Sequence, residues 1–487
     1  MKVAAESAPP RSGYVFGPRE TRGLLIGLRG TQLAILMVAL GALVLGLSSG
    51  PAGAVAGTAV LVVAAVAVFA PLSGRTPEQW APVLIRFVLK RMTGRHLYKR
   101  PLDAAAHLPE QLRDVRIISV PVAGGPSVGI VEDSSRGTLS AVMSVNGESF
   151  ALLDPSEQER RAGAWGALLA GLARDGSPVT RVQWVARAVP DTGQALRHFW
   201  ERAATRGGAA AASYEQLQAG AGAQGWRTET YLTVVVDARR ARSRGRAPRD
   251  QPPPGTQRLM RELAAVEARL AQCGLHIGGW LPPRGLAKVL RESYAMGSQR
   301  VLDGRGAEGS GPGVDPALAG PMAARDSWST YRTDDAWHAT YWIHEWPRLS
   351  VGSDFLGPLL SGGGARRTLS LIAEPVDSRH AARQIAAART AEVANQAMRD
   401  RVGQLTTERN RAEAADVERR EHEIAAGHAD YRFIGLLTVS AESPAALDEA
   451  CAQAEVTAHA CYLEILRLYG EQDEAFAAAL PIGRGLR

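Results

Sequence analysis

The clearest feature of the hydrophobic pattern is a long apolar stretch near the start of the chain. Residues 30–74 contain no Asp, Glu, Lys, Arg or His. The turn sequence Ser48-Ser49-Gly50-Pro51 divides this stretch into two apolar segments, 31–47 and 54–72. Each segment is close to the roughly 20 residues that cross the hydrocarbon core of a bilayer. The pattern therefore predicts a transmembrane helical hairpin over residues 30–74.

Two other structures fit part of this pattern. Ala52-Gly53-Ala54 has the small-x-small form of a signal-peptide cleavage site, and a soluble core could bury two apolar helices. However, the first apolar run is long for a signal peptide, the second run follows at once, and neither run has a polar stripe. These features favour the hairpin.

The charges that flank the hairpin predict its orientation. Residues 1–29 carry five basic and two acidic residues, residues 75–100 carry seven basic residues and one acidic residue, and the connecting turn carries neither. Positively charged loops stay on the cytoplasmic side of a membrane. We therefore expect a protein of the inner (cytoplasmic) membrane with two spanning helices, a cytoplasmic tail over 1–29 and both termini in the cytoplasm.

Residues 75–100 are predicted to form a basic amphipathic helix next to the membrane. Thr76 as N-cap, Pro77 at the first helical position and Gln79 at the third are typical of a helix start with a capping box. Apolar side chains then recur at helical spacing, at Trp80, Val83, Leu84, Phe87 and Val88.

This helix is the candidate site of membrane contact. A tryptophan at headgroup depth and cations near anionic lipid are typical of a helix that lies in the inner interface. The predicted membrane-interface residues are Trp80, Arg86, Phe87, Lys90 and Arg91. The alternative is a first core helix of the soluble part, and Pro82 would kink the helix or move its start.

Residues 101–487 contain no further apolar run long enough to span a membrane, and strand-like and helix-like patterns alternate along them. Strands are predicted at 128–132, 139–145, 149–153, 182–189, 231–237, 340–343, 367–372 and 433–439, and helices at 155–174, 193–223, 378–426 and 444–468. The segment 378–426 is charged on most faces, which favours a helical hairpin that projects from the body.

The expected fold is a membrane-anchored α+β protein in which the transmembrane hairpin precedes a large mixed α/β cytoplasmic region of two subdomains. The first subdomain covers 101–238, and the second covers 257–487 with the protruding helical hairpin 378–426. Residues 239–256, with six arginines and Pro252-Pro253-Pro254, are predicted to be a linker. Its charge leaves nucleic acid open as a partner, although the lack of interleaved aromatic residues favours a solvated linker.

Overall composition argues against a protein that coats DNA and against a disulfide scaffold. The 487 residues include 56 Lys and Arg against 49 Asp and Glu, a net charge of +7, which is far below that of a protein that coats DNA. The three cysteines, Cys273, Cys451 and Cys461, are an odd count, and the last two are ten residues apart in a predicted helix, too far to bond. A disulfide scaffold is therefore excluded.

No catalytic, cofactor-binding or metal-binding constellation is predicted. A P-loop, G-x-x-x-x-G-K-[ST], is absent from the sequence. The glycine motif at 304–309 has no strand closely before it, and the G-x-S-x-G motif at 125–129 is followed by a strand where a hydrolase needs a helix. His422 and His428 are six residues apart, so they fall on different helix faces. We expect no cofactor and no enzymatic activity.

Two groups of short motifs resemble known families. The hairpin, with Gly74-Arg75-Thr76-Pro77-Glu78-Gln79-Trp80 and Arg95-His96-Leu97-Tyr98-Lys99, resembles the PrgI-like two-helix membrane subunits of bacterial conjugation systems. The rest resembles the non-catalytic amino-terminal domain of the type IV secretion ATPase family. The stretches that carry this second resemblance are Tyr341-Trp342-Ile343-His344-Glu345-Trp346-Pro347, Phe355-Leu356-Gly357-Pro358-Leu359-Leu360, Leu371-Ile372-Ala373-Glu374-Pro375, Gly427-His428-Ala429-Asp430, Gln472-Asp473-Glu474-Ala475-Phe476 and Leu480-Pro481.

The resemblance implies a non-catalytic inner-membrane platform subunit of an actinobacterial conjugation or type IV-like secretion apparatus. Its implied partners are a separately encoded cytoplasmic P-loop ATPase, other membrane subunits and anionic lipid, with ring assembly of identical copies open by analogy. The motor's catalytic residues have no counterpart in this sequence. Two alternatives remain, a membrane subunit of a type VII secretion machine and a membrane-bound enzyme with an unrecognised site. The cargo, DNA or protein, stays open.

Overall fold

The computed structural model describes residues 30–485, except for 70–73, 102–107, 202–207, 239–254, 306–311, 403–414, 424–428 and a few shorter gaps. The predicted tail 1–29 and almost all of the predicted linker 239–256 therefore lie outside the described residues. The helices are α1 (Gly30–Ser48), α2 (Pro51–Phe69), α3 (Pro77–Met92), α4 (Pro155–Leu172), α6 (Ala209–Ala221), α7 (Thr256–Leu270), α8 (Pro283–Tyr294), α9 (Ser298–Gly304), α10 (Gly357–Ser361), α11 (Ser378–Val402), α13 (Pro444–Ala460) and α14 (Gln472–Ala479).

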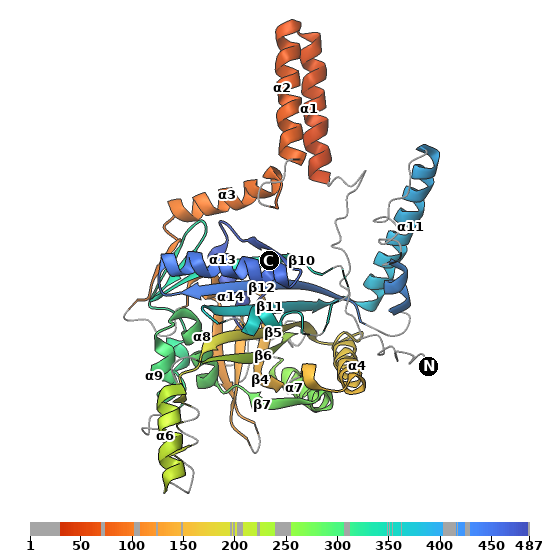
Figure 1. Cartoon of the computed structure of the whole chain (residues 1–487). Coiled ribbons are helices and arrows are strands. Elements are labelled where there is room, and N and C mark those ends of the chain that lie inside the picture. Colours follow the sequence, from red (N-terminus) through yellow and green to blue (C-terminus); the bar gives the residue numbers. More distant parts are fainter. Residues whose placement is uncertain are drawn as a thin grey trace, which may run out of the picture.

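The first two helices form an antiparallel hairpin that projects from the body, and α3 runs sideways at its foot (Figure 1). Small residues let the two backbones approach closely, because a Cβ atom on Gly57 would lie 2.8 Å from the Cα of Leu43. Large apolar side chains such as Val38 and Val55 point outward and are more than 70% exposed. Among the residues that the structure describes, no helix is both long enough and apolar enough to cross a membrane.

One antiparallel sheet of 13 strands forms the body, which confirms a mixed α+β class. The strands are β1 (Leu97–Lys99), β2 (Val115–Val120), β3 (Val128–Asp133), β4 (Thr138–Gly147), β5 (Val179–Pro190), β6 (Trp226–Asp237), β7 (Leu275–Trp280), β8 (Ala323–Asp326), β9 (Tyr331–Thr333), β10 (Ala336–Glu345), β11 (Arg366–Pro375), β12 (Tyr431–Ala441) and β13 (Glu464–Arg467). Their order is β1-β8-β9-β10-β12-β11-β5-β6-β4-β3-β2, with β13 beside β10 and β7 beside β4.

This sheet runs through both predicted subdomains. β5 of the first pairs with β11 of the second over seven residues, from Val182↔Ala373 to Ala188↔Arg367. The segment 239–256 therefore divides the sequence but not the sheet.

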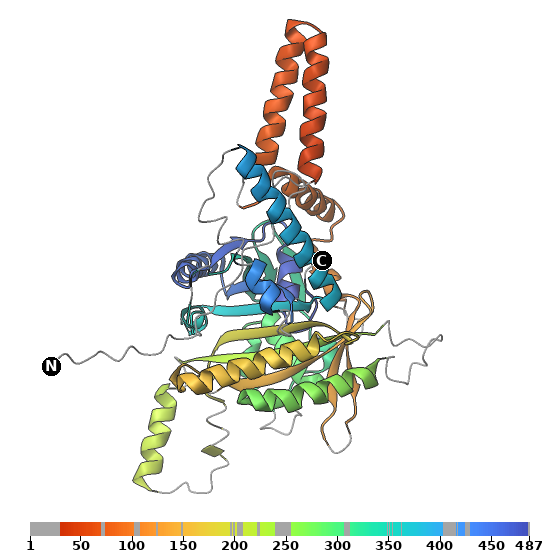
Figure 2. The same cartoon turned by 90° about the vertical axis from the view of Figure 1, so that its right-hand side faces the viewer.

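Helices cover both faces of the sheet, as the two views show (Figures 1 and 2). Alternate residues of β12 point to opposite faces. Leu437 packs in one cluster with Leu447 of α13, whereas Leu436 packs in another with Ala475 of α14. Under α4 and α7, β3, β4 and β6 contribute a third cluster of buried aliphatic side chains.

Several predicted elements are confirmed. The strands of seven of the eight predicted segments and the helix at 155–174 are present, and Gln79 Oε1 accepts a hydrogen bond from the Thr76 backbone at the start of α3. Within the segment 378–426, α11 projects from the body (Figure 1), residues 417–423 are helical, and Arg389 pairs with Glu421 at 2.9 Å. The turn of the predicted helical hairpin lies outside the described residues. The three cysteines are free and buried, as expected for a chain without a disulfide scaffold.

Three predicted elements are wrong in whole or in part. The basic amphipathic helix expected over residues 75–100 ends at Met92, and Leu97–Lys99 forms β1, which pairs with β8. The helix expected at 444–468 ends at Ala460, because Tyr462 turns the chain with φ of 58° and residues 464–467 pair with β10 as β13. The strand expected at 149–153 is instead a short 3-10 helix, Phe150–Leu152. The side-chain amide of Gln158 in α4 donates to the carbonyl oxygens of Phe150 (3.1 Å) and Leu153 (3.0 Å), so this segment is bonded to the helix that follows it.

Gln183 of β5 anchors the segment that follows α14 to the centre of the sheet. Its side-chain amide donates to the carbonyl oxygens of Ala478 (3.0 Å) and Leu480 (2.9 Å), and its oxygen accepts from the Gly483 backbone (2.7 Å). Because Gln183 is fully buried, no water replaces these bonds if the amide is lost.

Gln183→Leu should therefore lower the free energy of unfolding by about 3 kcal/mol or more, since several buried polar groups lose their partners. Chemical denaturation of the purified chain measures the change. Gln453→Leu, an exposed position on α13, is the control and should shift it by less than about 0.5 kcal/mol. Equal effects of the two substitutions would contradict the anchoring role.

Candidate membrane-interface site

Helix α3 has two apolar faces on opposite sides. One face carries Trp80, Val83, Phe87 and Lys90 at alternating spacings of three and four residues, and Val83 is 3% exposed. The opposite face consists of Leu84, Ile85, Val88, Leu89 and Met92, which follow the i, i+1, i+4, i+5, i+8 pattern of one helix side. We call the first set the body face and the second the outer stripe.

Aromatic side chains hold the body face. Trp80 lies 5.8 Å from Trp328 and 6.3 Å from Tyr469 between ring centroids, and Phe87 meets the edge of Trp328 at 5.0 Å. Gly470 completes this contact with φ of 74°, and a Cβ atom there would lie 2.7 Å from the Trp328 ring. Only glycine fits both the backbone conformation and the space.

At the C-terminal end of the body face, a buried network of ion pairs connects α3 to the body. Lys90 Nζ donates to Asp326 of β8 at 2.8 Å and also to Asp473 of α14, which Gln111 contacts as well. The side chains of Asp326 and Asp473 are 2% and 1% exposed. A second pair lies nearer the hairpin, where Arg75 contacts Glu471 at 3.0 Å.

Burial sets the protonation of these groups. Removal from water raises the pKa of Asp326 to about 7, with the neighbouring charge of Asp473 adding to the shift and Lys90 opposing it. Burial also raises the pKa of Asp473. Burial opposes the charge of Lys90, but the two carboxylates outweigh it and raise the pKa of the lysine. Lys90 therefore stays charged, and one carboxyl group holds a proton up to near-neutral pH.

The structure brings the five predicted interface residues together on α3 but points them in different directions. Trp80, Phe87 and Lys90 contact the body. Arg86 has a 56% exposed side chain and lies 3.5 Å from Glu471, and Arg91 stacks over the Phe87 ring at 6.0 Å. Contact of these five residues with lipid stays a prediction.

None of the residues of the outer stripe is among the five predicted interface residues, although Leu84 and Val88 belong to the predicted apolar spacing. The exposed fraction of the stripe's side chains ranges from 44% at Val88 to 79% at Met92. The signal was present in the sequence as the spacing of Leu84, Ile85, Val88, Leu89 and Met92. This signal is hard to recognise in the sequence, because the aromatic residues of the body face lie on the same helix and the two apolar patterns overlap.

The motifs that resemble catalytic sequences gain no support from their surroundings. Ser127 directly precedes β3, so a strand follows it, as the sequence indicated. The glycine motif starts at Gly304, where α9 ends, and residues 306–309 lie outside the described residues, as does His428.

Comparisons with known proteins leave the family open. No protein-family model matches the chain, and no curated protein matches it.

The network predicts how stability depends on pH. The pKa of Asp326 in the folded chain, about 7, lies above its ordinary value of 3.8, so the folded chain holds a proton that the unfolded chain releases between about pH 4 and 7. Stability should therefore fall as pH rises through this window, by at most about 1.4 kcal/mol per pH unit from this group.

Lys90→Met tests the network directly. Without the lysine two carboxyl groups share a buried site, so unfolding should become easier by about 3–5 kcal/mol at pH 8 and by clearly less at pH 5, where both groups take up protons. Denaturation at the two pH values measures this difference. Lys99→Met, exposed on β1, is the matched control and should have little effect at either pH. A loss that is the same at both pH values would argue against a charge network.

Proposed function

We propose that this chain is a membrane-anchored, non-catalytic platform subunit of a conjugation or type IV-like secretion apparatus. In this proposal the apolar hairpin predicted over residues 30–74 spans the inner membrane, α3 lies in the cytoplasmic interface, and the sheet domain lies on the cytoplasmic side. The outer stripe of α3 is the observation that carries the membrane part of the proposal.

Three features support contact between the outer stripe and lipid. The stripe lies opposite the body face, so docking of α3 on the body leaves it uncovered. Helix α3 lies at the foot of the apolar hairpin (Figure 1). The outward side chains of this hairpin are also exposed. Arg86 and Arg91 flank it with exposed side chains, where anionic headgroups would lie.

The body face makes α3 a firm link between membrane and domain. The Trp328 cluster and the Lys90 network fix the rotation of the helix about its axis, since a rotated helix would separate both sets of partners. A helix held in this way presents the outer stripe in one direction. The domain would consequently keep a constant orientation relative to the bilayer.

The secretion part of the proposal rests on the resemblance to two-helix conjugation subunits and to the non-catalytic domain of type IV secretion ATPases. The partner in this proposal is a separately encoded P-loop ATPase that docks on the sheet domain. Anchoring such a motor at the membrane would replace a bimolecular encounter by a high effective concentration.

Depth measurements on α3 test the membrane contact. An environment-sensitive fluorophore on a cysteine at Ile85 or Leu89 should show blue-shifted emission and several-fold stronger quenching by lipid-attached quenchers in anionic vesicles, because the outer stripe enters the interface. The native cysteines are at most 4% exposed and should label poorly.

The control for this measurement is a label at Val456, which is 66% exposed on α13, against 59% for Ile85. This label should behave as in water. If labels at Ile85 and Leu89 matched the Val456 label, the outer stripe would not contact lipid.

Affinity purification tests the secretion part. The tagged chain, crosslinked in native membranes and then solubilised in detergent, should recover a P-loop ATPase of the conjugation type in mass spectrometry. A two-helix membrane protein with the same tag serves as the control. Recovery of type VII components would instead assign the chain to a type VII secretion machine. Recovery of no partner after crosslinking would reject the proposal that the chain is part of a secretion assembly.

A further inference from the structure

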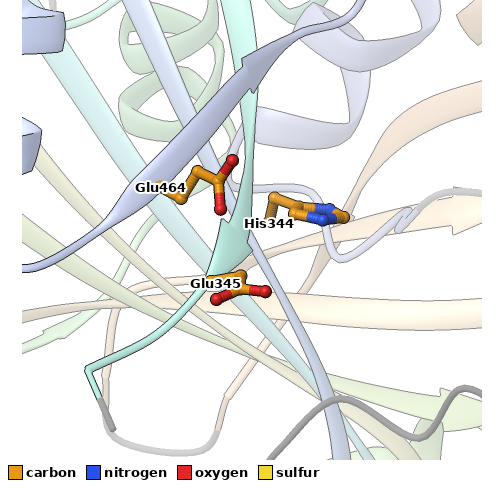
Figure 3. A group of neighbouring side chains, drawn as sticks. All are labelled: His344, Glu345 and Glu464. Atoms are coloured by element: carbon orange, nitrogen blue, oxygen red, sulfur yellow. The ribbon is translucent and has the colours of Figure 1, made fainter. Parts of the chain in front are cut away.

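Three potential metal ligands meet where β10 ends beside β13. They are His344 and Glu345 of β10 and Glu464 of β13, and one donor atom from each lies within 4.8 Å of the other two (Figure 3). His344 and Glu345 are partly buried, and Glu464 is exposed. Neither the membrane contact nor the ion pairs of α3 involve this cluster.

An irregularity in strand pairing creates the cluster. Consecutive residues of a regular strand point to opposite faces, which would separate His344 from Glu345. Here the register of β10 against β13 shifts between Ile343, which pairs with Ile465, and Glu345, which pairs with Glu464. His344 is therefore the extra residue of a β-bulge, a feature that re-aims side chains.

The same register places two like charges opposite each other. Glu345 and Glu464 are cross-strand partners, and carboxylates in that position repel and weaken the pairing. Within the described part of the chain, the Glu464 carboxylate has neither a hydrogen bond nor an ion pair. A divalent cation between the two carboxylates would turn this repulsion into attraction.

The donor set determines the class of cation. One imidazole nitrogen and two carboxylate oxygens suit zinc and other first-row divalent metals, whose bonds to such ligands are about 2.0–2.2 Å long. Donors on one ion therefore lie within about 4.4 Å of one another. The exposed Glu464 side chain can supply the small remaining movement through a change of rotamer.

We propose that His344, Glu345 and Glu464 bind one divalent transition-metal ion, with Zn²⁺ as the best-matched ion and water completing its coordination. The ion would fasten β13 to β10. β13 also carries Leu466, whose side chain lies against Gly74 at the foot of the hairpin. The site would thus reinforce the sheet directly below the membrane anchor.

Metal titration of the full-length chain in detergent, stripped with chelator and freed of any affinity tag, tests the proposal. Zn²⁺ should bind in competition with a chromophoric chelator at one equivalent per chain, and Co²⁺ should give d–d absorption bands of a site with nitrogen and oxygen ligands. His344→Gln and Glu464→Gln should each weaken Zn²⁺ binding at least tenfold. His459→Gln and Glu449→Gln, exposed positions on α13, are the matched controls and should leave it unchanged.

Glu464→Gln keeps the test independent of folding, because the side chain is exposed and the substitution preserves its shape. Circular dichroism should show the same fold for this variant. Zn²⁺ affinity that is equal in the parent chain and the His344→Gln and Glu464→Gln variants would overturn the proposal. So would a loss of affinity in the α13 controls as large as that in the site variants.

Discussion

Among the contacts that position α3, the strongest constraint is the need of the Lys90 ammonium group for anionic partners once it is largely buried. Removing such a charge from water costs several kcal/mol, and only close carboxylates offset the cost. Asp326 and Asp473 provide them from β8 and α14. In the rotation of α3 that brings the lysine to both carboxylates, the outer stripe faces away from the body.

The same ion pairs connect α3 to the centre of the sheet. Asp473 follows Gln472, which is fully buried and holds the Thr340 backbone of β10 at 2.8 Å. Leu480, which follows α14, accepts a hydrogen bond from the side-chain amide of Gln183 in β5. A short stretch of chain thus joins the charge network at α3 to two central strands, so displacement of α3 would disturb the sheet as well as the junction.

Most local elements could be predicted from the sequence, but the contacts between residues far apart in the chain could not. A charge-free stretch, a capping box and alternating strands are local signals, and they indicated the helical hairpin, the start of α3 and most of the strands. The direction in which α3 faces depends on partners 236 and 383 residues away, Asp326 and Asp473, which spacing alone does not reveal. Likewise, the bulge at His344 exists only because β13 pairs beside β10 with a shifted register. Tyr462, in a conformation uncommon for non-glycine residues, ended a helix that the pattern would have extended.

The free energy of transferring the outer stripe to lipid indicates how the hairpin and α3 would act together in the proposed membrane anchor. The five side chains of the outer stripe are 44–79% exposed, and at about 1.5–3 kcal/mol for complete burial of each, their transfer to lipid would yield roughly 4–9 kcal/mol before the cost of ordering. That gain is comparable with a lipid anchor whose hold is reversible, so the outer stripe alone would not keep the chain on a membrane. With the hairpin already inserted, the encounter cost is removed, and the same energy would suffice to hold α3 flat. The hairpin would then determine whether the domain is at the membrane, and α3 would determine how the domain faces it.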